Sequence, residues 1–376
     1  MEILVFLIVL GILVVIELVY YKKHALDDLD LDVSFSKKVA NCGEIVEVIE
    51  VAKNNKRLPL PFLILKFETP LELEFQDMTN TTISDLLYRL DMLTMKPFSK
   101  HTRKIKAKCT KRGFYSFNRV NISTSDLLLF ETMTKEFPNN ACLTVLPERL
   151  DNSEIATLLS LTLSEIQIRR TLLTDPFAFA GIRDYQPWDP MKSINWTASA
   201  KTGNFMVNTN ASTSAEKVTI FLNLEIYNTK RSTSLLEKSI SLAYTYMCEL
   251  SKNGIMCAIY TNGTDGVTKN PIILGADANR EDDIRRGTEL SRIDLKTDAL
   301  SFPILVDDYI SNTSTDDFIV VISPKFDGSF TDTMKSLKSK RKSALWIMPA
   351  YKTTPQLTAE QSIGKDYIRW EVKGHD

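Results

Sequence analysis

The sequence has little of the side-chain chemistry on which enzymes and metal proteins usually depend. Its 376 residues include 3 histidines and 5 cysteines, and the cysteines form no CxxC pair and have no histidine at ligand spacing. A zinc site is therefore not expected. An odd number of cysteines without a regular framework favours reduced, structural thiols in a reducing compartment. The cysteines are Cys42, Cys109, Cys142, Cys248 and Cys257.

An excess of charge of one sign is also missing. The formal net charge is -1, from 46 basic and 47 acidic residues. Such a chain has no overall attraction to polyanions, so we expect no nucleic-acid partner. The hydrophobic fraction of 44% and the charged fraction of 25% are those of a folded protein. The length is sufficient for two domains, each with its own core.

The amino terminus carries a long apolar run. Residues 3–21, "ILVFLIVLGILVVIELVYY", are almost all aliphatic and match the thickness of a hydrocarbon core. We expect one transmembrane helix within residues 1–23. Glu17 lies about one turn from its end, which favours an interfacial carboxylate over a proton relay, because the span contains no second ionisable group.

The residues around this run indicate an anchor rather than a cleaved signal peptide. No basic residue precedes the run, and no small-residue cleavage site follows it. Lys22 and Lys23 directly after the run predict that the bulk of the chain is cytoplasmic. The expected localisation is the cell membrane, with a single pass.

The next part of the chain, residues 31–147, consists of short alternating segments separated by turn residues. "EIVEVIEVAK" at 44–53 alternates aliphatic residues with glutamate, which predicts a strand with one solvated face. Repetition of such segments predicts a β-sandwich-like domain.

Two further features lie within this domain. Residues 85–93 have helical spacing and predict a short connecting helix. A basic stripe is interpreted as a solvated strand face rather than a lipid or partner contact; it comprises Lys104, Lys106, Lys108, Lys111 and Arg112.

From residue 148 to residue 376 the pattern changes to alternating helices and strands. Residues 153–170 and 331–342 predict helices, and so do residues 233–252. One face of that last helix carries Leu236, Ile240, Ala243, Met247 and Leu250. Near-continuous apolar runs of the kind found in buried parallel strands occur at 217–224, 254–261, 318–323 and 343–348. This alternation predicts a doubly wound α/β domain with right-handed crossovers.

Residues 181–204, "GIRDYQPWDPMKSINWTASAKTGN", crowd aromatic and charged residues together. Asp189 before Pro190, with Gly203 further on, predicts a single capped helix over residues 190–202. Arg183 could pair with Asp189 or brace backbone carbonyls. No Cys or His nucleophile-base pair is present, and neither Ser193 nor Ser199 has a base at evident spacing. These observations favour a structural scaffold over a catalytic site, and leave open whether Trp188 and Trp196 face the core or a partner.

The same segment resembles the signature of the bacterial "domain of unknown function 58" family, whose pattern approximates G-x-R-x-Y-x-x-G-D-x-x-R-x-I-x-W-x-x-S-A-R. Trp188 replaces the usual glycine, and Lys192 and Lys201 replace arginines. The matching positions are Gly181, Arg183, Tyr185, Asp189, Ile194, Trp196, Ser199 and Ala200.

The resemblance implies a von Willebrand A-like fold for the carboxyl-terminal domain. It also implies a MoxR-type AAA+ ATPase partner, together with other membrane or envelope proteins, in the maturation of envelope or protein complexes. The implied activity is non-enzymatic binding or assembly.

A von Willebrand A-like fold raises the question of a metal-ion-dependent adhesion site with the motif D-x-S-x-S. Asn223, Glu225 and Tyr227 occupy those positions, and Ser323 or Pro324 stands at the later aspartate position. Because both serine positions are lost, we expect no bound metal, although Asn223 and Glu225 are weak candidates for Mg²⁺.

Two alternatives to the binding protein follow from these patterns. One is a divalent-metal-dependent, adhesion-type module on the outer face of the membrane. The other is a hydrolase, for which the sequence offers no triad, metal motif or phosphate loop.

Overall fold

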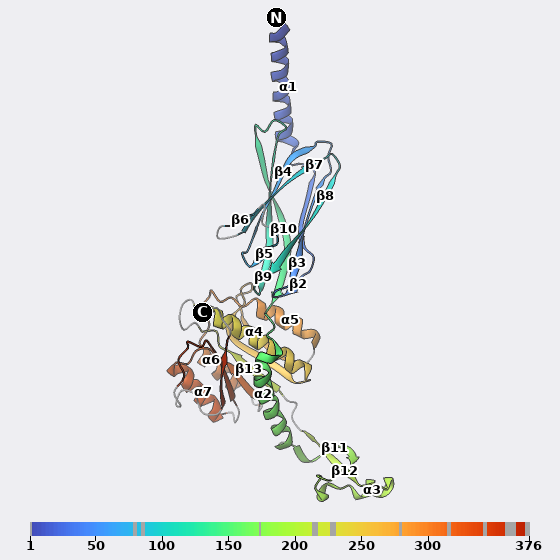
Figure 1. Cartoon of the computed structure of the whole chain (residues 1–376), viewed down its shortest axis with the longest axis vertical. Helices are drawn as coiled ribbons and strands as arrows, with labels where there is room; N and C mark the ends of the chain where they lie inside the picture. Colours follow the sequence, from blue (N-terminus) through green and yellow to red (C-terminus); the bar gives the residue numbers. More distant parts are fainter. Residues whose placement is uncertain are drawn as a thin grey trace. The chain divides into compact units, whose positions relative to one another are not determined.

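A computed structural model of the chain describes ten segments, and these fall into two compact units. The first unit is Met1–Glu148 with Gly287–Ile293, and the second is Arg149–Arg286 with Asp294–Asp376. Each unit is described by itself, and its elements can be followed in Figure 1. The described segments are 2–77, 81–83, 87–172, 174–212, 217–225, 231–277, 280–313, 317–340, 344–357 and 366–372.

The chain starts with the apolar helix α1, Glu2–His24. Among the described residues it is the one helix long and apolar enough to cross a membrane, with a mean hydropathy of 3.1. Its last turn does not end in a free linker. Tyr21 and Ala25, 2% and 0% exposed, belong to the hydrophobic core of the first unit. The Tyr21 hydroxyl donates to the carbonyl oxygen of Pro59 at 3.0 Å, so α1 is joined directly to the β domain.

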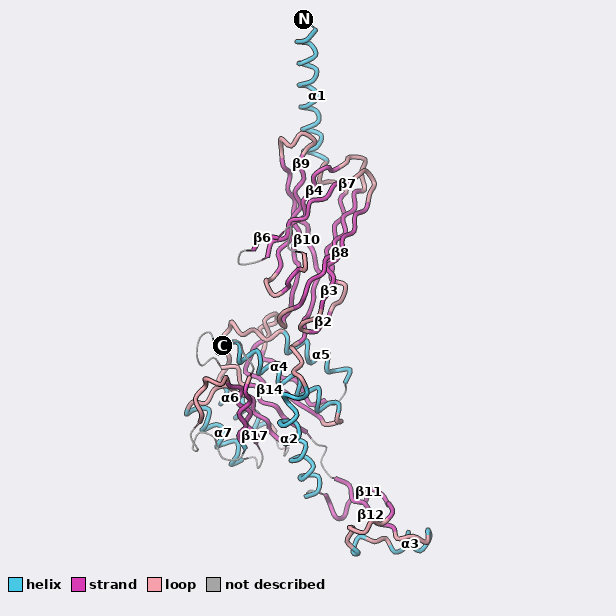
Figure 2. Tube along the Cα trace, in the orientation of Figure 1, coloured by secondary structure: helices cyan, strands magenta, loops and turns pink. Residues whose placement is uncertain are grey.

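That β domain consists of two sheets, as predicted for a sandwich, and Figure 2 shows its strands in magenta. Strand β3 alternates in burial as predicted, with Val46, Val48 and Ala52 facing inward and Glu47 less buried, but Glu50 occupies an inward position as well. The core between the sheets includes Phe35 stacked on Phe117, with ring centroids 4.6 Å apart.

The sheet orders are β1-β3-β8-β5 and β2-β10-β9-β4-β7-β6. The strands are β1 Leu29–Phe35, β2 Val39–Asn41, β3 Ile45–Asn54, β4 Leu60–Thr69, β5 Leu73–Phe75, β6 Thr81–Ile83, β7 Leu87–Met95, β8 Lys100–Cys109, β9 Gly113–Ser125 and β10 Thr132–Leu146.

The helix predicted over residues 85–93 is wrong where the structure describes the segment. Residues 84–86 lie outside the described residues, and the chain from Leu87 to Met95 is strand β7. Two inward-facing positions of this strand hold Arg89 and Asp91, both 0% exposed, and Leu93 and Met95 hold the next two, while Leu90 and Met92 face outward. This inversion removed the apolar alternation by which a strand is recognised.

The two buried residues of β7 belong to an ionic cluster between the sheets. The Arg89 Nε donates to Asp91 Oδ2 at 2.6 Å, and Arg103 Nη1 donates to Asp91 Oδ1 at 2.5 Å. Asp77 Oδ2 lies 3.6 Å from Arg103 Nη2. Glu50 of β3, 2% exposed, completes the group. Burial, and then the neighbouring Asp91 carboxylate, raise the pKa of Glu50 to about 8.

The basic stripe of the β domain is only partly a solvated face. Lys104, Lys106, Lys108 and Lys111 are exposed, as predicted. Lys104 pairs with Glu47 of the neighbouring strand at 3.4 Å. Arg112 is 8% exposed and therefore does not belong to the solvated face.

The second unit contains a sheet of order β15-β14-β13-β16-β17-β18, which confirms the predicted α/β class. All neighbours pair in parallel except β15, which pairs antiparallel with β14. The apolar runs that predicted buried strands form β13, β14, β16 and β17. The strands are β13 Lys217–Leu222, β14 Met256–Thr264, β15 Pro271–Asp277, β16 Phe318–Ile322, β17 Ala344–Ala350 and β18 Tyr367–Glu371.

Helices cover this sheet. Helices α6 and α7 contribute Phe302, Tyr309 and Phe330 to a core with Phe221 and Trp346 of the strands. Helix α4 contacts β13, β14 and β17, and all five residues of its predicted apolar face are 0% exposed. The helices after Glu148 that carry the fold are α2 Asn152–Leu172, α4 Arg231–Lys252, α5 Arg280–Ser291, α6 Phe302–Asn312 and α7 Gly328–Lys340.

The five cysteines are free thiols. Burial raises the pKa of Cys109 to about 11 and that of Cys257 to about 12, so both remain protonated and unreactive near neutral pH. Cys248 is buried as well, whereas Cys42 is half-buried and Cys142 is exposed. The expectation of cysteines as small apolar side chains therefore holds for the three buried thiols and not for Cys142.

The Glu50 cluster predicts a specific pH dependence of stability. With Glu50 protonated, two carboxylates balance two guanidinium groups, and ionisation adds an uncompensated buried charge. Because the folded-state pKa of about 8 exceeds the ordinary 4.5, protonation stabilises the fold. This stabilisation is fully present below pH 4.5 and is lost as the pH rises through about 8.

We expect the melting temperature of the wild type to fall relative to that of Glu50→Gln as the pH is raised from about 5 to about 9. Thermal unfolding of the full chain in detergent measures this difference. Glu68→Gln, which changes an exposed glutamate of β4, is the control and should show no such trend. A wild-type to Glu50→Gln difference that is constant across this pH range would contradict the prediction.

Candidate functional site

The signature segment forms a β-hairpin with a helical insertion. Strand β11, Thr174–Asp184, pairs antiparallel with β12, Met206–Ser212. Between the strands lie a 3₁₀ turn, η1 Met191–Ser193, and a short helix, α3 Trp196–Thr202. We call this unit, residues 181–208, the signature hairpin.

The single helix predicted over residues 190–202 is wrong, because the segment is interrupted at Ile194, which bridges to Val207 instead. The N-cap of α3 is Asn195, whose side-chain oxygen accepts from the Ala198 N–H at 2.9 Å. Asn195 thus has the role that the sequence assigned to Asp189. The predicted end is confirmed, since Gly203 has a φ of 78° and donates to the Ser199 carbonyl.

Asp189 holds the turn instead of capping a helix. Arg183 donates to both oxygens of Asp189, at 2.6 and 2.7 Å, and also to the carbonyl oxygen of Asp184. Both contacts considered from the sequence are therefore made. The Gln186 N–H donates to the same carboxylate at 2.9 Å. The guanidinium first, and then this N–H, lower the pKa of Asp189, so the carboxylate stays charged.

Ser199 is a structural hydroxyl. It donates to the Asn195 carbonyl at 2.8 Å and accepts from the Met206 N–H at 2.8 Å. The bond with Met206 ties α3 to β12, and Asn195 adds a side-chain bond to Asn208 of the same strand at 2.8 Å. The arrangement leaves Ser199 no role as a nucleophile with a neighbouring base.

Large apolar side chains of the signature hairpin are left exposed. Trp188 is 78% exposed, Met191 68%, Trp196 62% and Phe205 57%. Trp196 packs edge-on against Phe205, with ring centroids 6.2 Å apart. We call these four residues the aromatic face. The question that the sequence left open for the two tryptophans is answered, because neither is in a core.

The remaining signature residues differ in burial. Ile194 is 7% exposed, and Tyr185 is half-buried with its ring 6.1 Å from that of Phe205. Gly181 is half-buried and Ala200 is exposed. Phe205, which the family pattern does not include, was missed from the sequence; its position beside the Gly203 stop was the available signal.

A second candidate site lies at the carboxyl ends of β13 and β16. These strands are neighbours, but β13 leads through α4 to β14 on one side and β16 leads through α7 to β17 on the other. Ligands of doubly wound sheets bind at such switch points. The residues that follow the two strands here include Asn223 and Ser323, together with Glu225, Lys325 and Asp327. We call this group the switch-point cluster.

Asn223 is fully engaged in joining the strand ends. Its Nδ2 donates to Ser323 Oγ at 3.1 Å, and its Oδ1 accepts from Asn262 Nδ2 at 3.0 Å and from the Glu225 N–H at 3.1 Å. The side chain is 0% exposed. Asn223 therefore serves as a buried polar brace.

Glu225 forms an ion pair with Lys325 of the same chain. Lys325 Nζ lies 2.7 Å from Glu225 Oε2 and 2.9 Å from Asp327 Oδ2. Burial disfavours the ammonium, but the two carboxylates outweigh burial and raise the pKa of Lys325. Glu225 Oε1 accepts the first N–H of α6, from Phe302, at 2.8 Å. Asp327 Oδ1 accepts the Phe330 N–H at 3.0 Å and so caps α7.

The switch-point cluster does not fit a divalent cation. Its two carboxylates already share an ammonium whose charge would repel a metal ion, and no group of three or more His, Cys, Asp or Glu residues suited to a metal occurs among the described residues. Tyr227, the third motif position, lies outside the described residues. Lys325, which the sequence reading missed, could have been noticed as a basic residue just after a buried strand.

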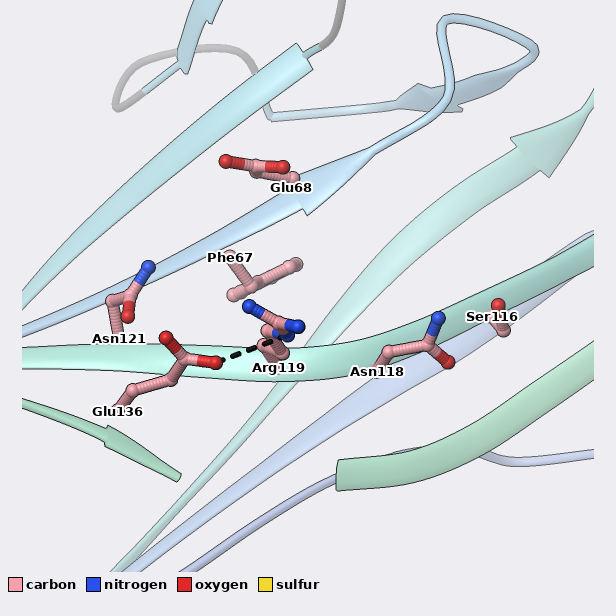
Figure 3. Close-up of a pocket in the computed structure, with 7 residues that line it drawn as sticks. All are labelled: Phe67, Glu68, Ser116, Asn118, Arg119, Asn121 and Glu136. Carbon is pink, nitrogen blue, oxygen red and sulfur yellow. Dashed lines mark ion pairs between the residues drawn. The ribbon is translucent and has the colours of Figure 1, made fainter. Parts of the chain in front are cut away.

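The β domain also has a shallow hollow of about 370 Å³ over strands β4, β9 and β10 (Figure 3). Arg119 and Glu136 pair across it at 3.1 Å. Both side chains are largely exposed, 74% and 49%. Its lining has no nucleophile with a base and is that of an ordinary solvated sheet face, so we assign it no ligand. The lining residues are Phe67, Glu68, Ser116, Asn118, Arg119, Asn121 and Glu136.

Comparisons with known proteins add little to this picture. No protein-family model matches the chain, and no curated protein matches it. The CARDB domain of the PF1109 protein from Pyrococcus furiosus is similar over 32% of this chain and 96% of its own, with 18% identity and a TM-score of 0.21. A non-cellulosomal cohesin from Archaeoglobus fulgidus is similar over 34% and 97%, with 12% identity and a TM-score of 0.23. Likenesses this distant carry no argument about function.

The switch-point cluster predicts how the protein responds to Mg²⁺. We expect no shift of the wild-type melting temperature in millimolar Mg²⁺, because Lys325 neutralises the available carboxylates. In Lys325→Gln the carboxylates lose their counter-ion, so Mg²⁺ should raise the melting temperature of that variant. Lys338→Gln, which breaks an exposed pair with Asp366, is the matched control. A Mg²⁺-dependent rise in the wild type that disappears on Lys325→Gln would contradict the account.

Proposed function

We propose that this chain is a membrane-anchored, non-enzymatic binding protein that docks a partner protein through the aromatic face of its signature hairpin. The carrying observation is the exposure of Trp188, Met191, Trp196 and Phe205 on a hairpin held by Arg183–Asp189 and Ser199 hydrogen bonds. Large exposed apolar surface on a polar support is typical of protein interaction sites. Tryptophan is also enriched among the residues that contribute most to binding.

The support of the hairpin favours binding over catalysis. Arg183, Asp189 and Ser199 are used in the hairpin's own hydrogen bonds, so these groups hold a preformed surface with exposed apolar side chains instead of serving as reactive groups. A surface that is ordered before binding loses less conformational entropy in a complex. In this proposal the signature residues fix the shape of the contact, and Trp188, which stands where the family has glycine, enlarges it.

The proposed partner is a cytoplasmic MoxR-type AAA+ ATPase, and the proposed role is the maturation or assembly of envelope or other protein complexes. This partner follows from the family resemblance of the signature. A cytoplasmic position for the bulk of the chain is supported by Lys22 and Lys23 after the apolar span. We further propose that the second unit is von Willebrand A-like, which the doubly wound strand order supports.

The adhesion-type alternative receives less support. It needs a divalent cation at the switch point, where Lys325 already binds Glu225 and Asp327. A hydrolase is equally unsupported, because Ser199 has no base and Asp189 is held by Arg183. The switch-point cluster is better explained as a structural lock between β13, β16, α6 and α7.

The proposal predicts that loss of the two exposed tryptophans weakens partner binding but leaves the stability of the fold nearly unchanged. In the double variant Trp188→Ser with Trp196→Ser, loss of exposed side chains should change the free energy of unfolding by less than about 1 kcal/mol. Affinity for the purified MoxR-type ATPase of the same organism should fall at least ~30-fold, as expected when central aromatic contacts are removed. Interferometry with the full chain in nanodiscs measures the affinity, and thermal unfolding measures the stability.

Ile304→Ser is the matched control, because Ile304 is a 70% exposed aliphatic residue on α6. It should bind as the wild type does. Undiminished binding by the double tryptophan variant would contradict the proposed docking surface, and a marked loss of its thermal stability would show that these residues pack against other parts of the chain.

A further inference from the structure

The loop between β9 and β10 exposes four consecutive large apolar residues. Leu127 is 51% exposed, Leu128 48%, Leu129 60% and Phe130 70%. They stand between Asp126 and Glu131, in the sequence "DLLLFE". We call residues 127–130 the apolar loop. A run of this kind is unusual on a water-facing turn, where polar residues and glycine are the rule.

The apolar loop is held in shape by the residue that precedes it. Asp126 is 0% exposed, and its carboxylate accepts the Leu128 N–H at 3.0 Å and the Glu131 N–H at 2.7 Å. The Leu129 N–H donates to the Asp126 carbonyl at 3.2 Å. With the backbone closed on itself in this way, the four side chains project outward as a fixed apolar knob.

This loop touches the apolar helix α1 inside its predicted span. The Leu127 N–H donates to Glu17 Oε1 at 2.9 Å, and Lys22 Nζ pairs with Glu131 Oε1 at 2.5 Å. Glu17 precedes Tyr21 by four residues, which is about 6 Å along a helix at 1.5 Å per residue. The loop therefore reaches back along α1, past the residues at which the helix enters the β domain (Figure 2).

The connection between α1 and the β domain is too short to let the domain move away from the bilayer. Tyr21 and Ala25 are core residues of the domain, and β1 starts at Leu29. Lys56 Nζ donates to the Ala25 carbonyl at 2.6 Å, and the Lys56 carbonyl accepts the N–H of Phe98 at 3.2 Å. Phe98, 66% exposed, is thus a second apolar side chain at the end of the domain that meets α1.

We propose that the apolar loop inserts into the interfacial region of the lipid bilayer as a second membrane contact, together with Phe98 at the end of the domain that meets α1. This inference rests on α1 being a membrane anchor, as in the proposed function. Burial of four large apolar side chains in the interface removes their surface from water. It also gives Glu17 a partner within the span, because the backbone of the same loop donates to one oxygen of its carboxylate.

A lipid surface fits these observations better than a protein partner does. The loop contacts a residue of the predicted span itself, so lipid acyl chains and headgroups are its immediate surroundings once α1 is inserted. Two contacts, the helix and the loop, would then fix the tilt of the β domain on the membrane, which a single helix with a flexible linker cannot do.

The test places a fluorescent probe at chosen depths in the full chain. Cys42 and Cys142, the two thiols that are not buried, are first changed to serine, and a nitrobenzoxadiazole label is attached to Leu128→Cys in lipid nanodiscs. Val19→Cys, in the helix span, is the positive control. Leu71→Cys is the matched control, because Leu71 is a leucine of similar exposure, 45%. It follows the end of β4, whereas Pro59, which contacts α1, precedes the start of that strand.

Nanodiscs containing lipid with a nitroxide on the acyl chain should quench the probe at Leu128 strongly, as they quench the probe at Val19, and leave Leu71 unaffected. If Val19 is quenched and Leu128 behaves like Leu71, the loop contact is refuted while the anchor stands. A probe at Leu128 that is blue-shifted but not quenched would identify a protein contact and also refute the proposal. An unquenched Val19 would refute the anchor and the loop contact together.

Discussion

The feature on which the architecture depends is the direct burial of the end of α1 in the core of the β domain. Tyr21 and Ala25 are packed among the strands, so the helix and the sandwich form one body. In the proposed membrane-anchored protein, this rigid join would make the bilayer a reference plane for the domain. The apolar loop, Glu17 and Lys22 lie together at this join, and we propose that this end of the domain faces the membrane.

In both candidate sites, charged side chains form ion pairs with one another that hold the local fold. Arg183 holds Asp189 in the signature hairpin, and Lys325 holds Glu225 in the switch-point cluster. A group paired in this way is a poor nucleophile, base or metal ligand. The signature hairpin also exposes four large apolar side chains, and these support the proposed binding role.

Strands could be predicted from the sequence where their apolar residues follow burial, either continuously for a strand buried on both faces or alternately for a strand buried on one. The aliphatic runs of β13 and β16 and the alternation of β3 were sufficient to assign them. The prediction failed at β7, where Arg89 and Asp91 occupy two inward positions and Leu90 faces outward. Periodicity assumes that polar side chains face water, and a buried ionic cluster reverses that assumption.

The signature was located correctly from its residue pattern, but its geometry was not. Asp189 before Pro190 is a good helix start locally, yet the bidentate contact with Arg183 uses the carboxylate, and Asn195 takes over the cap. Such competition between two partners for one side chain depends on the hairpin pairing, which spacing along the chain does not encode.

The most direct test of the proposal that the aromatic face docks a partner is hydroxyl-radical footprinting of the full chain with and without the purified MoxR-type ATPase. The account predicts that oxidation of Trp188 and Trp196 falls when the complex forms, and unchanged oxidation of both in a formed complex would contradict it.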